Sequence, residues 1–115
     1  MMRLMMLLIV CTGLCLAADA TGKWSGTLSL GDGVMPGYMV LAQNGAAVTG
    51  TAGGGPDGQH PIEKGTAEQD QVTIEARPGP TLLKFVMKQQ GDKLSGEVFE
   101  DGQRIGTISL DRVEK

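Results

Sequence analysis

Apolar and polar residues alternate along most of the chain after residue 20. Trp24, Leu28 and Leu30 share one face of an extended segment, and polar residues between them occupy the other face. This period of two is typical of a strand with one buried face. Helical spacing of apolar residues, with a repeat of three or four positions, does not occur past residue 20. The pattern therefore predicts an all-β fold.

Turn residues divide this part of the chain into about eight short strands. We expect them at 24–30, 38–43, 48–52, 62–66, 72–76, 83–87, 93–99 and 104–110. Asn44-Gly45 is the strongest turn signal, because both residues tolerate the positive φ of a two-residue hairpin. Segment 40–50 also resembles segment 86–96, so the same hairpin is expected twice. An antiparallel up-and-down meander that closes into a small barrel removes its exposed edges, and we predict this architecture.

The connections between the expected strands differ in length. If successive strands alternate in direction, the longer connections at 31–37, 53–61, 78–80 and 101–103 fall at one end of the barrel. The opposite end receives only tight turns, and we call these two ends the mouth and the closed end. Binding residues commonly lie in loops on a rigid scaffold. The candidate binding residues in or beside the mouth connections are Met35, Tyr38, Asp57, His60 and Arg77.

The start of the chain has the features of an export signal. Arg3 gives a short positive start, and the mostly apolar run at 4–16 is too short to span a bilayer comfortably. Small residues then offer a signal peptidase two sites, one after Ala18 and one after Ala20. We therefore expect residues 1–20 to be a signal peptide and the protein to be secreted or periplasmic.

The remaining residues, 21–115, form a single β-barrel domain in this interpretation. Both cysteines, Cys11 and Cys15, lie in the expected signal peptide, so no disulfide would cross-link the domain. A net charge of −3 disfavours nucleic acid and anionic membrane surfaces as partners. No cofactor or metal is expected, because His60 is the only histidine and a zinc site needs three or four convergent ligands. No membrane span is expected after residue 20, and the oligomeric state stays open.

Two residues near the ends of the domain carry a family resemblance. Gly22-Lys23-Trp24 opens the first expected strand, and Arg112 follows the last one. Because successive strands alternate in direction, both residues fall at the closed end, where we expect Trp24 and Arg112 to meet. This arrangement resembles the Gly-x-Trp signature and closing arginine of calycin barrels, the lipocalin, fatty-acid-binding and avidin-like proteins. The whole domain also resembles small exported bacterial proteins, mostly uncharacterised, built on repeated hairpins. Avidins line their pocket with several tryptophans, and this chain has one.

Three functions remain open from the sequence. The first is non-enzymatic binding of a small apolar ligand or an envelope protein partner through the mouth. The second is a small hydrolase or isomerase that uses His60 with the mouth carboxylates Asp57, Glu100 and Asp101. The third is a structural or inhibitory module with a filled barrel, which strands of about six residues would favour because they enclose little volume. The internal volume of the barrel and the hydrogen-bond partners of His60 separate these possibilities.

Overall fold

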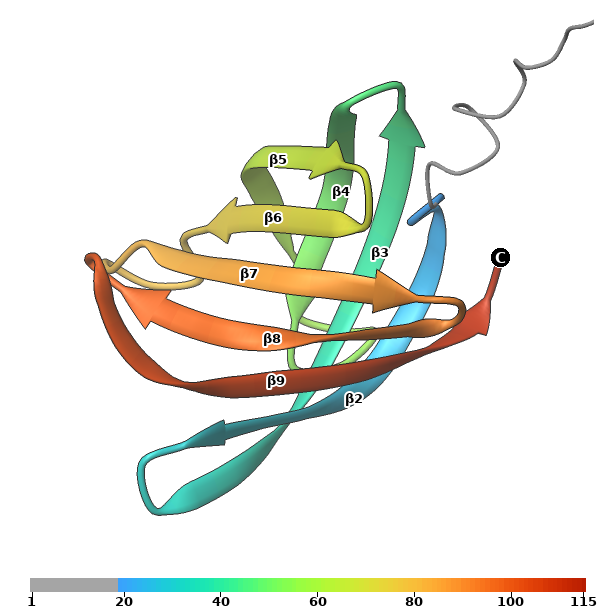
Figure 1. Cartoon of the computed structure of the whole chain (residues 1–115). Coiled ribbons are helices and arrows are strands. Elements are labelled where there is room, and N and C mark those ends of the chain that lie inside the picture. The colour runs from blue at the N-terminus through green and yellow to red at the C-terminus, as the bar shows by residue number, and fades with distance from the viewer. Residues whose placement is uncertain (1–18) are drawn as a thin grey trace, which may run out of the picture.

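The structure is a computed structural model that describes residues 19–115. The expected signal peptide lies outside the described residues except for Asp19 and Ala20. Eight antiparallel strands follow one another in chain order, and the last pairs with the first to close a barrel (Figure 1). They are β2 (Gly22–Leu30), β3 (Gly33–Asn44), β4 (Ala47–Gly53), β5 (His60–Glu68), β6 (Gln71–Ala76), β7 (Leu83–Gln90), β8 (Lys93–Glu100) and β9 (Gln103–Glu114). The predicted all-β meander and its closure into a barrel are confirmed.

The inward face of each strand supplies the core. In β6, Val72, Ile74 and Ala76 are buried, while the residues between them are at least partly exposed. The same alternation runs through β7, where Phe85 and Met87 are buried. The largest fully buried side chain is Trp24 of β2. No helix among the described residues is long and apolar enough to cross a membrane.

The two similar sequence segments form two hairpins with the same register. β3 and β4 pair Leu41 with Gly50, and β7 and β8 pair Met87 with Gly96. Both glycines are required by close backbone approach, because a Cβ at either would collide with a carbonyl oxygen of the paired strand. The repeated hairpin therefore places the same close strand contact at two positions around the barrel.

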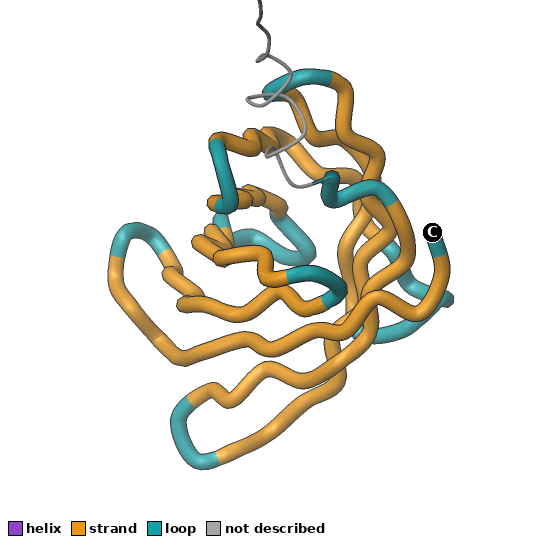
Figure 2. The backbone as a smooth tube through the Cα atoms, turned by 45° about the vertical axis from the view of Figure 1, so that its right-hand side comes forward, coloured by secondary structure: helices purple, strands orange, loops and turns teal. Residues whose placement is uncertain are grey.

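The connection expected at 31–37 is wrong. The structure has a tight turn at 31–32, and β3 already begins at Gly33, so β2 and β3 form a long hairpin that projects beyond the barrel (Figure 2). Pro36 is tolerated in β3 because β4 reaches only as far as Gly53, which pairs with Tyr38. Along 33–37 the β4 side of the strand has no partner, so no ladder bond needs the missing N–H. β3 and β9 have 12 residues each, whereas the expected strands at 38–43 and 104–110 have six and seven.

Candidate functional site

The connections at the two ends of the barrel differ in length, as the alternating strand directions predicted. Connections 31–32, 54–59, 77–82 and 101–102 lie at the mouth, and two-residue turns at 45–46, 69–70 and 91–92 lie at the closed end. Two of the mouth connections are as short as those turns. The difference between the ends therefore comes from the longer connections 54–59 and 77–82 and from the projecting hairpin.

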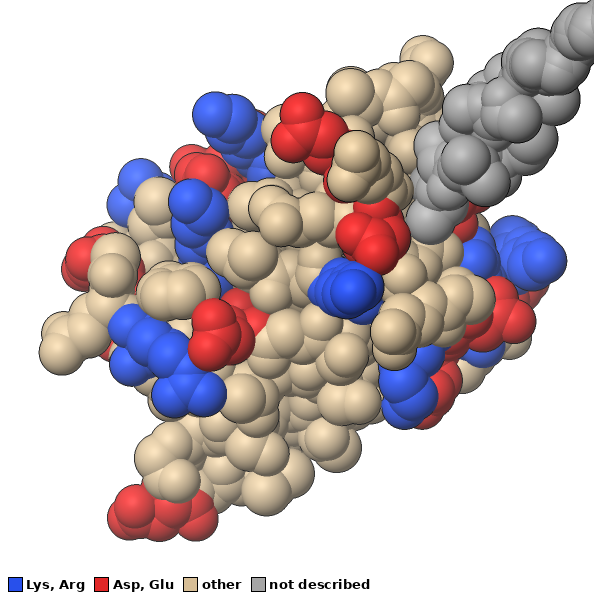
Figure 3. Space-filling model, viewed as in Figure 1, with Lys and Arg blue, Asp and Glu red and all other residues tan. Residues whose placement is uncertain are grey.

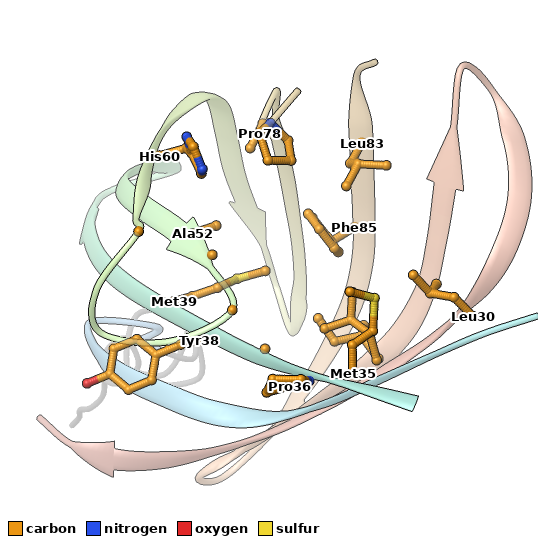
Figure 4. Close-up of a pocket in the computed structure, with 17 residues that line it drawn as sticks. Leu30, Met35, Pro36, Tyr38, Met39, Ala52, His60, Pro78, Leu83 and Phe85 are labelled. Carbon is orange, nitrogen blue, oxygen red and sulfur yellow. The ribbon is translucent and has the colours of Figure 1, made fainter. Parts of the chain in front are cut away.

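A pocket of about 210 Å³ opens at the mouth (Figure 4). Strands β2 to β7 and β9 all contribute residues to its wall. Its apolar side chains are Leu28, Leu30, Met35, Pro36, Met39, Ala52, Ala76, Pro78, Leu83, Phe85 and Ile108. Glycine backbone completes the wall, and among the described residues that line it only Tyr38 and His60 have polar side-chain groups. The pocket is therefore an almost wholly apolar space inside a polar protein surface.

Small inward-facing residues leave this space open. Ala52 of β4 is 6% exposed and Ala76 of β6 is 2% exposed, yet each side chain contributes a single carbon to the wall. Ala76 is buried without belonging to the contiguous core of the barrel, so it faces the pocket instead. Met39 and Phe85 are buried members of that core and also line the pocket. The contiguous core therefore reaches the inner wall of the pocket, and the pocket opens from it toward the mouth.

The loop at 54–59 is fixed by one glutamine. The Nε2 group of Gln59 donates hydrogen bonds to the carbonyl oxygens of Gly55 and Tyr38, at 2.7 and 3.2 Å. The hydroxyl of Thr51 donates to Oε1 of Gln59 at 2.7 Å. These bonds tie the loop to β3 and β4, so the pocket wall formed by its glycines is anchored to the barrel. No motif in the sequence marked Gln59, because two of its three partners are backbone carbonyl groups, which carry no sequence signal.

The structure brings three of the five candidate binding residues to the pocket. Met35, Tyr38 and His60 line it, although the Tyr38 ring points away from the other labelled side chains (Figure 4). Asp57 is exposed in the loop and does not line the pocket. Arg77 is directed outward, where its Nε lies 3.2 Å from Oε2 of Glu63. His60 is therefore the polar side chain that faces the pocket.

His60 is the first residue of β5 and is half-buried. It takes part in none of the ion pairs among the described residues, so no carboxylate lies in contact with it. Within residues 19–115, no three His, Cys, Asp or Glu side chains are grouped so that they could hold a metal ion. The chemistry available at the pocket is apolar contact together with one imidazole, which can donate or accept a hydrogen bond.

The closed end is built around Trp24 and Arg112, which the structure brings together. Trp24 is 0% exposed, and the guanidinium carbon of Arg112 lies 4.6 Å from the centre of its ring. This is the geometry of a cation–π contact. The Nη1 group of Arg112 donates to the carbonyl oxygen of Thr21 at 2.6 Å, and its Nε donates to Oδ1 of Asp92 at 2.8 Å. The arginine therefore joins the start of β2 to the β8 side of the barrel.

No family model, curated protein or solved structure matches the chain. A function is therefore inferred from the pocket and from the two ends of the barrel.

Proposed function

We propose that this protein is an exported, non-enzymatic carrier or sensor that binds a small apolar ligand in the mouth pocket. The observation that supports this proposal is the pocket of about 210 Å³ with an almost wholly apolar wall. A filled structural barrel would leave no such space. An enzyme that uses His60 would need a carboxylate or another reacting group in contact with it, and the described ion pairs include none.

The volume sets the size of the ligand. An engineered apolar cavity of about 150 Å³ stays dry and binds benzene. A volume of 210 Å³ equals about seven water-sized groups, at roughly 30 Å³ each. The ligand buried here is therefore a single ring or a short alkyl chain. A longer chain would extend over the rim, where Leu30 and the 49%-exposed Met35 provide further apolar surface.

The affinity follows from the same volume. Each buried methylene group contributes about 0.8 kcal/mol, which is roughly a fourfold gain in affinity. Seven such groups contribute about 5–6 kcal/mol before the cost of immobilising the ligand. We expect a Kd no tighter than about 0.1 mM, with His60 favouring ligands that end in a hydroxyl or carbonyl group near the rim.

A chain-length series tests this function. Unbranched 1-alkanols from pentanol to dodecanol are titrated against the purified protein, and displacement of a fluorescent naphthalene probe is measured. Affinity should rise about fourfold per methylene until the chain fills the pocket, and then level off. Equal affinity across the series, or no displacement by any member, would exclude the mouth pocket as a binding site for such ligands.

Two alanine substitutions locate the binding. Ala52→Leu places three further carbons in the pocket and should lower alkanol affinity at least tenfold. Ala42→Leu adds the same group to an exposed position of β3 and should leave the affinity within twofold. Trp24 is the only tryptophan and lies at the closed end, so its fluorescence reports whether both variants keep the fold. If Ala52→Leu binds like the unchanged protein, the ligand does not occupy this pocket.

A protein partner of the envelope is the second candidate, supported by the projecting β2–β3 hairpin. Val34 near its tip is 70% exposed, and the hairpin surface is mostly uncharged up to an acidic end (Figure 3). Val34→Ser should leave alkanol affinity unchanged, because Val34 does not line the pocket. A photo-crosslinker at position 34 in exporting cells should then capture a partner only if this candidate is correct.

The calycin type of the barrel also remains part of this proposal. The packing of Arg112 over Trp24 at the closed end supports it, as does the position of the pocket at the opposite end.

A further inference from the structure

Ala20 is buried at the closed end with both backbone groups bonded. It is 0% exposed, and its carbonyl oxygen accepts a hydrogen bond from Nε1 of Trp24 at 2.9 Å. Its N–H donates to Oε1 of Gln43 at 2.8 Å. Burial and paired backbone groups are properties of a residue inside a folded domain, whereas a leader segment that is later removed has no need of either.

Asp19 is held by the same end of the barrel. Its carbonyl oxygen accepts hydrogen bonds from Nη1 of Arg112 and Nε2 of Gln89, both at 3.0 Å. Its carboxylate Oδ1 accepts the N–H of Thr21 at 3.0 Å. The Thr21 backbone and hydroxyl groups lower the pKa of this carboxyl, with smaller contributions from Arg112 and Lys115. Residues 19–21 thus form a plug that is bonded to three separate parts of the barrel.

Two of the groups that hold the plug come from the repeated hairpin. Gln43 and Gln89 occupy equivalent positions, two residues before the turn glycines Gly45 and Gly91. Each Nε2 donates to the carbonyl oxygen of its own glycine, at 3.0 and 3.1 Å. Each side chain also binds the plug, Gln43 at Ala20 and Gln89 at Asp19. The closed end therefore presents two equivalent amides to residues 19 and 20.

We propose that the export signal is cut after Ala18, and not after Ala20, so that the mature protein keeps Asp19 and Ala20 as its plug. A signal peptidase would hydrolyse the peptide bond between Ala18 and Asp19 with one water. The released peptide then ends in a carboxylate, and the mature chain begins with an α-ammonium group. Cleavage after Ala20 would instead leave the buried indole N–H of Trp24 without its acceptor.

A buried oxygen atom without a hydrogen-bond partner also supports cleavage between Ala18 and Asp19. Among the described residues, Oε1 of Gln89 has no hydrogen-bond partner, and Gln89 is 5% exposed. A buried amide oxygen without a donor is costly and needs an explanation. Cleavage before Asp19 puts three N–H donors on the residue whose carbonyl oxygen Gln89 already binds, where the uncut peptide has one.

The first test identifies the mature amino terminus. The full precursor is expressed with its own leader in a bacterium that exports proteins, and the exported protein is examined by intact mass and N-terminal sequencing. A chain that begins at Asp19 supports the proposal. A chain that begins at Thr21, or a precursor that stays uncut, overturns it.

A pair of proline substitutions gives an independent test that does not depend on folding, because the leader is cut during export. Asp19→Pro turns the proposed bond into a tertiary amide without an N–H, and Thr21→Pro does the same to the bond after Ala20. In a pulse-chase experiment, Asp19→Pro should slow the loss of precursor at least tenfold, and Thr21→Pro should change it less than twofold. The reverse result would place the cut after Ala20.

Discussion

Ala52→Leu tests by stability whether the mouth half of the barrel is hollow. Ala52 is 6% exposed and lines the pocket, so its side chain points into the barrel and not into water. The substitution adds three carbon atoms to that space. In a filled barrel the added atoms would have no room and would force strain, whereas in a pocket of about 210 Å³ they would contact the apolar wall.

The sign of the change follows from the available space. Three buried carbons contribute about 2.4 kcal/mol at about 0.8 kcal/mol each. Fixing a leucine side chain costs about 0.5–1 kcal/mol of conformational entropy. We therefore expect Ala52→Leu to raise the free energy of unfolding by about 1.5 kcal/mol, which corresponds to a rise in Tm of about 6–12 °C for a domain of this size.

Ala67→Leu is the matched control. Ala67 of β5 is 8% exposed and, like Ala52, belongs to the contiguous core, but it lies toward the closed end and does not line the pocket. The same three carbons have no pocket there, and overpacking should cost about 1–3 kcal/mol. Urea unfolding followed by circular dichroism measures both variants. If Ala52→Leu is destabilised as much as Ala67→Leu, the pocket is not an open space in solution, and the ligand proposal fails with it.

Three further outcomes are expected. Gly96→Ala should cost about 1–3 kcal/mol in urea unfolding because its Cβ would strike a carbonyl oxygen of β7, while Gly79→Ala, which meets no atom within 4 Å, should change stability by less than about 0.5 kcal/mol. Trp24→Phe should cost about 1–3 kcal/mol, because the Ala20 carbonyl loses its buried donor; equal stability of the two proteins by circular dichroism would contradict this role. Asp19 has a lowered pKa, so its stabilising effect is present above its ordinary value of 3.8 and is lost as pH falls through the folded value. Asp19→Asn should therefore reduce stability at pH 7 and flatten the acid limb of a Tm-against-pH curve, and unchanged curves would exclude this contribution.

The strands and the two ends of the barrel were predictable because each strand buries one face. Alternation of apolar residues identifies such strands locally. Because successive strands run in opposite directions, every connection can then be assigned to one end of the barrel. The alternation of side chains along β6 could also have placed Arg77 correctly. Val72, Ile74 and Ala76 face inward, so the next residue faces outward. The expected loop at 31–37 was wrong for a non-local reason. Pro36 is allowed in β3 only because β4 ends before reaching it.

The pocket was not predictable from the pattern, because its volume is a sum over side chains from distant strands. Ala52 and Ala76 look like ordinary small core residues in the sequence. In the fold they share one wall with the glycines at 37 and 53, which add no side-chain atoms to the space. A small residue at the mouth-side end of an inward-facing row is the signal that could have indicated a hollow mouth.

The two ends of the barrel also determine the direction from which a ligand enters. Entry through the closed end would require displacement of Trp24, which is 0% exposed, and loss of the hydrogen bonds that Arg112 donates to residues 19 and 21. Each buried group left unbonded in that process would cost about 1–3 kcal/mol. At the mouth the pocket is open, and Met35, which lines it, is 49% exposed and flexible. A ligand of the proposed site would therefore enter and leave past the projecting β2–β3 hairpin, and substitutions at Met35 should change its association and dissociation rates more than its affinity.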